Sequence, residues 1–246
     1  MDILRICLWS GPRNVSTALM YSFAQRDDTR ALDEPFYSHY LRVSGATHPG
    51  RAEVIASMES DGARVIQDVI LGPCNRPILF MKQMTHHLVE IDRSFMKYTT
   101  NVLLIRDPID MLPSLAKILD APTLRDTGFK TQFELLNELK QIGQEPPIID
   151  ARELLLHPPG VLRQLCERLG IPFQDSMLKW NAGPHSEDGV WAKYWYDNVH
   201  RTTGFQPYRK KTDLFPQELV PLLEECRPYY QALHAIAIKA HEEMDK

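Results

Sequence analysis

The chain has 246 residues, of which 43% are hydrophobic and 24% charged, a composition typical of a globular protein with one α/β domain or two small ones. Its net charge of −4 argues against a general nucleic-acid binder, although a local basic pocket remains compatible with it. Four widely spaced cysteines argue against a zinc site, and the sequence has neither a long apolar run nor a signal-peptide pattern, so we expect a soluble, cytoplasmic protein without membrane insertion.

The first stretch, Ile3–Arg26, predicts a strand, a tight turn and a helix. Ile3–Trp9 is almost entirely apolar, as expected for a strand buried in a parallel sheet. Ser10–Asn14 is a run of turn formers, and apolar residues then recur at helical spacing in Val15–Phe23.

A helix start has unpaired N–H groups and a dipole that favours an anion. Arg13, Ser16 and Thr17 add a cation and two hydroxyls at this start. From these residues alone, two interpretations stay open: a phosphate-binding loop, or a plain strand–turn–helix unit with a Gly-Pro turn. The Gly-Lys pair of the nucleoside triphosphatase loop is missing.

The rest of the chain alternates strands with helices. The predicted strands are Ala31–Phe36, Pro77–Met84, Asn101–Ile105 and Pro147–Ala151. The predicted helices are Arg51–Ser60, one from Ile109, Thr131–Gln144, Gly160–Leu169 with Gly170 as its stop, and a terminal one from about Gln217. This alternation predicts an α/β fold, with a parallel sheet and helices on both faces.

In such a sheet, ligands bind at the carboxyl ends of the strands. The loops that follow Trp9, Met84 and Ile105 are therefore expected to share one rim. The side chains of interest on that rim are Arg13, Ser16, Thr17, His86, His87, Arg106 and Ser114.

The second informative stretch is Asn101–Leu115. Arg106 stands at the end of a predicted strand, and Ser114 lies about two turns into the next helix. A guanidinium offers a planar fork of donors that suits phosphate oxygens. A purely structural interpretation, with an Arg-Asp turn and a filler serine, also remains open.

The pairing of SGPRNVST with RDPIDMLPS resembles the sulfotransferases that use 3′-phosphoadenylyl sulfate (PAPS). Their 5′-phosphosulfate loop reads G-x-x-[KR]-S-G-T-[TS], and their 3′-phosphate element reads R-[DN]-P-x-[DE]-x-x-x-S. The matching residues are Gly11, Arg13, Ser16 and Thr17 in the first motif and Arg106, Asp107, Pro108, Asp110 and Ser114 in the second. Asn14 and Val15 replace the usual Ser-Gly, so the loop backbone must suit a β-branched residue.

A third segment, Ile148–Phe173, is similar to a strand–turn–helix segment of the same family, although Asp150 replaces the commoner Tyr-Glu. The stretches LDEPFYSHYL and AGPHSEDGVWAKYWYDNVHRTTGF resemble a bacterial and plant subgroup that is sometimes labelled aminotransferase-like. The motifs are those of a nucleotide-sulfate site and not of a pyridoxal phosphate site.

The resemblance implies a P-loop-type parallel sheet flanked by helices, the three-layer sandwich of the sulfotransferases. It also implies a single domain over residues 1–246. We place its core at about residues 1–173 and a helical, aromatic-rich part at about 174–246.

For the donor, the resemblance implies that Arg13, Ser16 and Thr17 hold the 5′-phosphate of PAPS and that Arg106 and Ser114 hold the 3′-phosphate. Arg201 and Gly204 are the candidates for the family's loop over the 3′-phosphate, although their spacing matches poorly. The basic run Arg209–Lys211 is explained at least as well as a solvated face. PAPS is then the co-substrate, adenosine 3′,5′-bisphosphate (PAP) the product, and no metal is required.

The family often uses a histidine after a central strand as general base. His86 is our first choice because it follows the predicted strand Pro77–Met84, and a histidine near its usual pKa is largely neutral at pH 7. Glu34 is the rival base, since a carboxylate in an apolar pocket has a raised pKa. Lys82 either meets the bridging oxygen or is a strand-edge residue. Each of these residues also has a purely structural interpretation, as part of a turn or strand end.

We therefore predict transfer of a sulfuryl group from PAPS to a hydroxyl or amine of a small-molecule acceptor. The acceptor's identity and the oligomeric state, including a homo-oligomer, stay open. Two other classes are a nucleotide-binding protein without transferase activity and, less favoured, a kinase-like phosphotransferase. No ligand contact is assigned to the late aromatic residues Trp180, Trp191, Tyr194, Trp195 and Tyr196, because aromatics at helical spacing are more often core.

Overall fold

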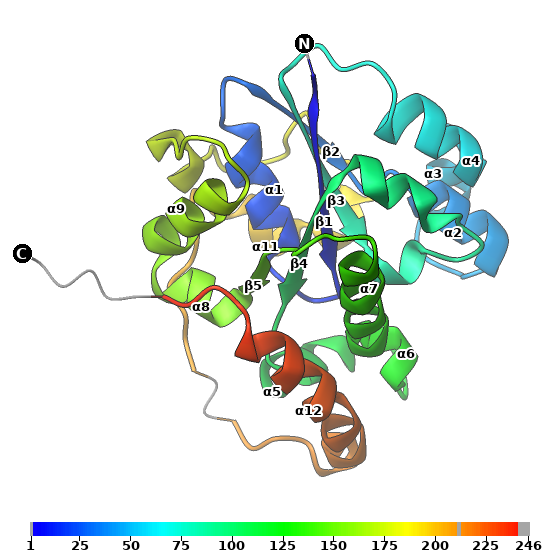
Figure 1. Ribbon diagram of the computed structural model, residues 1–246. Coiled ribbons are helices and arrows are strands. Elements are labelled where there is room, and N and C mark those ends of the chain that lie inside the picture. The colour runs from blue at the N-terminus through cyan, green and yellow to red at the C-terminus, as the bar shows by residue number, and fades with distance from the viewer. Residues whose placement is uncertain (1, 211–212, 241–246) are drawn as a thin grey trace, which may run out of the picture. The chain divides into compact units, whose positions relative to one another are not determined.

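The computed structural model describes residues 2–210 and 213–240. Its centre is a five-stranded parallel sheet in the order β2-β3-β1-β4-β5, flanked by helices (Figure 1). The strands are β1 (Leu4–Ser10), β2 (Thr29–Asp33), β3 (Ile78–Met84), β4 (Thr100–Ile105) and β5 (Ile148–Asp150). The predicted α/β fold class is thus confirmed, and each predicted strand is present with small changes at its ends.

The chain divides into two compact units, each built from early and late segments. In their described parts, the first comprises residues 2–8, Ser16–Asn101 and Gln174–Gly204, and the second comprises Trp9–Val15, Val102–Phe173 and residues 205–210 and 213–240. The single domain expected from the sequence, with its core at about residues 1–173, stays a prediction.

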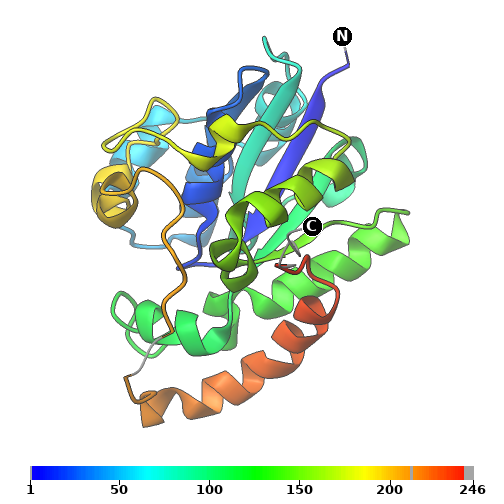
Figure 2. The same cartoon turned by 90° about the vertical axis from the view of Figure 1, so that its left-hand side faces the viewer.

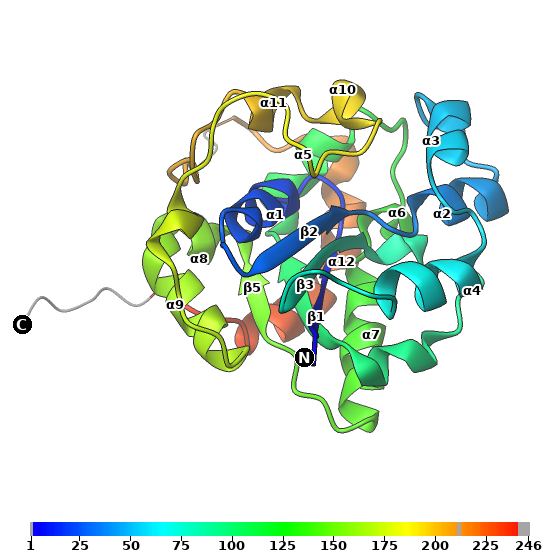
Figure 3. The same ribbon diagram turned by 90° about the horizontal axis from the view of Figure 1, so that it is seen from above.

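In the first unit, α1 packs against β2 and β3 (Figure 3). Phe23 of α1 stacks on Phe80 of β3 with ring centroids 4.1 Å apart, and both rings are buried. Strand β2 pairs in parallel with β3, which sets Asp33 opposite Lys82. The helical elements of this unit are α1 (Ser16–Ala24), α2 (Tyr37–Ser44), α3 (Arg51–Ser57), α4 (Gly62–Arg64), η1 (Val65–Ile70), η2 (Thr85–His87), η3 (Arg93–Tyr98), η4 (Asp175–Leu178), α10 (Ala192–Trp195) and α11 (Asp197–His200).

In the second unit, the long C-terminal helix α12 packs along α7 and α5 (Figure 2). Its buried face joins an apolar cluster that includes Leu112, Phe129 and Leu223. The helical elements of this unit are α5 (Pro108–Leu115), α6 (Leu124–Thr127), α7 (Phe129–Gln141), α8 (Ala151–Leu156), α9 (Pro158–Arg168), η5 (Gln217–Leu219) and α12 (Val220–Ala235).

Local signals fix several helix ends in the second unit. Asp107 caps α5 by accepting a hydrogen bond from the Ile109 N–H at 2.9 Å, with Pro108 in the first helical turn. Gly170 has a left-handed φ of 68° just beyond α9, which confirms it as the predicted stop. Within the part of the chain that the structure describes, no helix is both long and apolar enough to cross a membrane.

Candidate functional site

The loop that follows β1 lies in the second unit and is held tightly there. A Cβ on Gly11 would lie 2.7 Å from the carbonyl oxygen of Thr127, so only glycine fits without a shift of the backbone. Asn14 donates from Nδ2 to the carbonyl oxygen of Leu104 at 3.1 Å and accepts from the Val15 N–H at 2.9 Å. The side chain of Asn14, which stands where the family usually has serine, therefore ties the turn to β4.

The backbone strain of this loop falls on Arg13. Its φ is 55°, in the left-handed region that non-glycine residues rarely occupy. Val15 is not among the described residues with positive φ, so the predicted compatibility with a β-branched residue is confirmed. Strain of this kind costs on the order of 1–3 kcal/mol and is common at functional sites.

Two guanidinium groups meet at this loop. Arg13 donates from Nε to the Ser114 hydroxyl oxygen at 2.9 Å, and Arg106 donates from Nη1 to the carbonyl oxygen of Arg13 at 2.8 Å. Burial lowers the pKa of Arg106, which nevertheless remains a cation at neutral pH because an arginine pKa is so high. The structure thus brings together three of the predicted donor-binding residues within one unit.

The remaining predicted phosphate ligands, Ser16 and Thr17, follow this loop directly in the chain. They are the first two residues of α1 and belong to the first unit. Ser16 is buried and Thr17 is half-buried.

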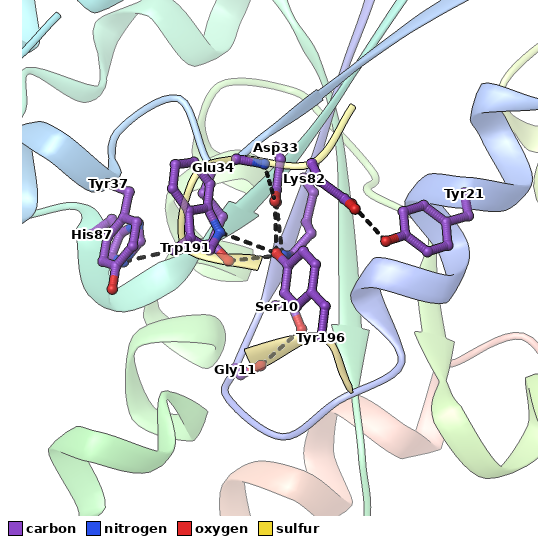
Figure 4. Close-up of polar contacts among 12 residues, drawn as sticks. Ser10, Gly11, Tyr21, Asp33, Glu34, Tyr37, Lys82, His87, Trp191 and Tyr196 are labelled. Atoms are coloured by element: carbon purple, nitrogen blue, oxygen red, sulfur yellow. Dashed lines mark hydrogen bonds and ion pairs between the residues drawn. The ribbon is translucent and has the colours of Figure 1, made fainter. Parts of the chain in front are cut away.

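The first unit contains a buried ion cluster around Lys82 (Figure 4). The Lys82 ammonium donates to Asp33 Oδ1 at 2.8 Å, to Glu34 Oε1 at 2.7 Å and to the Tyr196 hydroxyl. The two carboxylates raise the pKa of Lys82 well above its ordinary value even though burial opposes this. Lys82 is therefore a fixed cation. Lys82 does not lie on an edge strand of the sheet, because β3 has β2 on one side and β1 on the other.

Glu34 lies just beyond β2 with a left-handed φ of 42°, directly before Pro35. Both features are unfavourable for a glutamate. The conformation is held by a hydrogen bond from the Glu34 N–H to the Lys82 carbonyl at 2.9 Å. Burial raises the pKa of the Glu34 carboxyl, and Lys82 counteracts part of that effect. Glu34 therefore combines a strained backbone with a poorly solvated carboxylate.

Sequence reasoning assigned no role to Asp33 and missed Tyr196. Its hydroxyl donates to Asp33 Oδ2 at 2.7 Å and accepts from the Trp191 indole N–H at 3.2 Å. Both aromatic side chains are buried, as expected for core residues, yet their polar ends face the ion cluster. The local pattern held no signal for this role beyond the density of aromatic residues.

The two histidines that follow β3 differ in their distance from Glu34. His87, and not His86, approaches Glu34, with Nε2 at 3.8 Å from Oε2. The His87 ring is buried and stacks on Tyr37 and Tyr40 at centroid distances of 5.0 and 4.7 Å, and burial lowers its pKa well below the usual value. His86 is half-buried, and its ring stands nearly perpendicular to those of Tyr40 and His87.

The candidates for the closing loop lie at the surface of the first unit. Arg201 is exposed and forms an ion pair with Asp197 at 2.7 Å. Gly204 pairs with Lys179 in an isolated antiparallel bridge. In the run Arg209–Lys211, Arg209 and Lys210 are exposed, whereas Lys211 lies outside the described residues.

Comparisons with known proteins place this chain in a family. The family described as "Sulfotransferase domain" matches residues 4–237, nearly the whole chain. The chain therefore belongs to the sulfotransferase family, as the motifs around Arg13 and Arg106 indicated.

Similar solved structures have the same fold. A sulfotransferase domain from the curacin biosynthetic pathway superposes with a TM-score of 0.60 at 16% identity and covers 94% of this chain and 98% of that one. A sulfotransferase from Alicyclobacillus acidocaldarius gives a TM-score of 0.55 at 10% identity and covers 99% of this chain and 98% of that one. At these identities the likeness concerns the fold.

The sequence relatives carry a different name. Branched-chain-amino-acid aminotransferase-like proteins 2 and 1 of Arabidopsis thaliana are 43% and 42% identical to this chain over 92% of its length. The chain spans 40% and 41% of their lengths, so their names describe much longer proteins. The label agrees with the subgroup that the sequence resembled.

Proposed function

We propose that this protein transfers the sulfuryl group of PAPS to a hydroxyl or amine of a small-molecule acceptor. Membership of the sulfotransferase family supports this. The observation that carries the proposal is the hydrogen bond between Arg13 and Ser114, because it joins the two motifs that the family uses for the two phosphates.

In this proposal Arg13, Ser16 and Thr17 bind the 5′-phosphate end of the donor, and Arg106 with Ser114 binds the 3′-phosphate. Guanidinium groups form short, strong hydrogen bonds with phosphate oxygens, and a helix start favours an anion. Arg201 and Gly204 stay candidates for a loop over the 3′-phosphate. Protein cations supply the counter-charge, so we assign no metal.

During transfer, the bond between sulfur and the 5′-phosphate oxygen breaks, and a bond forms between sulfur and the acceptor oxygen or nitrogen. PAP leaves with the bridging oxygen, and the acceptor's proton passes to a base. Such a transfer needs in-line positioning and fixed donors at the developing charge. We assign Glu34 as the base and keep His86 as the alternative, because the raised pKa of Glu34 suits proton uptake.

The names of the plant relatives suggest an aminotransferase, which would need a lysine amine able to form a Schiff base with pyridoxal phosphate. Lys82 is the fully buried lysine of the first unit, but two carboxylates hold its ammonium and raise its pKa. This chemistry favours a structural cation over an amine nucleophile. The sulfotransferase proposal therefore fits Lys82 better.

A direct test is to incubate the protein with PAPS and a panel of phenols, alcohols and amines, and to follow PAP by chromatography. Acceptor-dependent PAP formation is the expected result. Binding of PAP without turnover of any acceptor favours the nucleotide-binding class instead. A preference for ATP over PAP in a thermal-shift assay favours a kinase-like phosphotransferase and contradicts the proposal.

A further inference from the structure

The two adjacent carboxylates of the ion cluster have unequal environments. Asp33 accepts hydrogen bonds from Lys82 at 2.8 Å, from the Tyr196 hydroxyl at 2.7 Å and from the Gly189 N–H at 3.4 Å. Among the described residues, the Glu34 carboxylate accepts a hydrogen bond from Lys82 alone.

Exposure separates the two acids in the same way. The side chains of Asp33 and Lys82 are 1% and 2% exposed, whereas that of Glu34 is 11% exposed. The side chains of Asp33 and Lys82 are almost completely buried. Glu34 thus has the most exposed side chain of the three.

Tyr196 is held firmly where it meets this cluster. Its ring lies 4.8 Å from the Lys82 ammonium and packs with Tyr37, Leu41 and Trp191 in one apolar cluster. The segment that carries it is fastened a second time through Asp188, which accepts from the Tyr21 hydroxyl at 2.5 Å and lies 2.8 Å from His200 Nε2. The aromatic-rich segment is thus anchored to α1 before Tyr196, and His200 after Tyr196 contacts the same carboxylate.

The anchoring of Tyr196 affects how negative charge is shared between the two carboxylates. One ammonium faces two carboxylates, and two neighbouring carboxylates in a poorly solvated site do not ionise equally. The Tyr196 hydroxyl and the Gly189 N–H stabilise negative charge on Asp33 in particular. The acid with fewer donors is then the better proton acceptor.

We propose that Asp33 and Tyr196 are positioning residues that hold the Lys82 ammonium in place, and that they leave Glu34 as the carboxylate that takes the acceptor's proton. This inference rests on the proposed function. The proton moves from the acceptor's O–H or N–H to a Glu34 oxygen while the acceptor atom bonds to sulfur. The late aromatic segment, which had no role in the sequence analysis, thereby supports catalysis.

The charged and titratable groups around Glu34 come from five elements. They are Asp33 at the end of β2, Lys82 of β3, His87 of η2, Tyr37 of α2 and Tyr196 just after α10. His87 is neutral because burial depresses its pKa, and both tyrosines are neutral because burial raises theirs. The charges of Asp33 and Lys82 therefore dominate the electrostatic environment of Glu34.

The test measures Glu34 directly by following the pH dependence of its side-chain carboxyl signal in protein labelled with 13C at glutamate Cδ. Glu34→Gln identifies the signal. Asp33→Asn removes a like charge, so the Glu34 midpoint should fall by about one pH unit or more. Tyr196→Phe removes the hydroxyl that stabilises Asp33, so the Lys82 ammonium is drawn toward Asp33 and the Glu34 midpoint should rise.

Tyr194→Phe is the matched control, since this exposed tyrosine lies two residues from Tyr196. It should leave the Glu34 midpoint unchanged. Trp191→Phe removes the donor to the Tyr196 hydroxyl and should shift the midpoint in the same direction as Tyr196→Phe, by less, which keeps the test open if Tyr196→Phe does not fold.

Equal midpoints in wild type, Tyr196→Phe and Trp191→Phe, or a rise in Asp33→Asn, overturn the inference. Failure of the proposed function has a separate signature, because a wild-type protein that does not bind PAP in calorimetry contradicts that function whatever the carboxyl signals show. If the variants transfer the sulfuryl group, Tyr196→Phe should move the pH profile of kcat upward together with the Glu34 midpoint, while PAP affinity stays within about twofold, as expected for a residue that acts only through the base.

Discussion

The Nε atom of Arg13 lies 2.9 Å from the hydroxyl oxygen of Ser114, a residue 101 positions further along the chain. The contact joins the loop after β1 to the helix after β4, and Arg106 adds a hydrogen bond to the Arg13 carbonyl. Arg13 adopts a left-handed φ to make it. Hydrogen bonds within the protein therefore tie together the two motifs that we propose to bind the phosphates.

Ser114→Ala should weaken PAP binding about tenfold, because it removes a proposed 3′-phosphate ligand and the partner that orients Arg13. A hydrogen bond to a charged group contributes about 1.5–3 kcal/mol, which corresponds to at least this loss. Isothermal titration calorimetry measures the effect. Ser186→Ala, on an exposed serine of the first unit, is the control and should bind PAP like wild type. Unchanged affinity in Ser114→Ala contradicts the assigned role of this hydroxyl.

Lys82→Met should reduce the free energy of unfolding by about 3–5 kcal/mol at pH 7, because it leaves Asp33 and Glu34 buried without their cation. Urea denaturation provides the measurement. Without Lys82, burial raises the pKa of the Glu34 carboxyl unopposed in the folded state, so the loss should shrink as the pH falls and this carboxyl becomes protonated. The same change at the exposed Lys130 should have an effect below about 1 kcal/mol. A Lys82→Met protein as stable as wild type speaks against the ion cluster.

His87→Phe should remove part of the acid sensitivity of the protein. Burial holds the pKa of His87 well below 6.5 in the folded state, so the unfolded chain binds a proton there that the folded chain does not. Its contribution to stability is present above about pH 6.5 and is lost as the pH falls below that value, by at most about 1.4 kcal/mol per pH unit. Phenylalanine keeps the stack on Tyr37 and Tyr40 without a titrating group. Urea titrations at several pH values should show a shallower slope for the variant; an identical slope contradicts a neutral, buried His87.

The sheet could be predicted from the sequence because its strands are short apolar runs bounded by turn formers. The motifs around Arg13 and Arg106 could be found because each is contiguous. Helix α2 was not predicted, since it has only eight residues and two of its buried side chains, Ser38 and His39, are polar.

The ion cluster around Lys82 was harder to predict because its contacts are long-range. Tyr196 meets Asp33 and Lys82 across 163 and 114 residues, and no local pattern encodes such a contact. The preference for His86 assumed that the geometry of the strand continues beyond Met84. The chain instead turns into a 3-10 helix over Thr85–His87, and there it is His87 that approaches Glu34.

The central claim is that the Arg106 guanidinium binds the 3′-phosphate of the donor nucleotide. Calorimetry of PAP and of adenosine 5′-monophosphate, with wild type and Arg106→Ala, tests it most directly, and Arg168→Ala on an exposed arginine serves as the control. Wild type and Arg168→Ala should prefer PAP by at least about tenfold, or 1.4 kcal/mol, and Arg106→Ala should lose most of that preference while it retains adenosine 5′-monophosphate binding. Equal weakening of both nucleotides in Arg106→Ala, or no preference for PAP in wild type, would contradict the account.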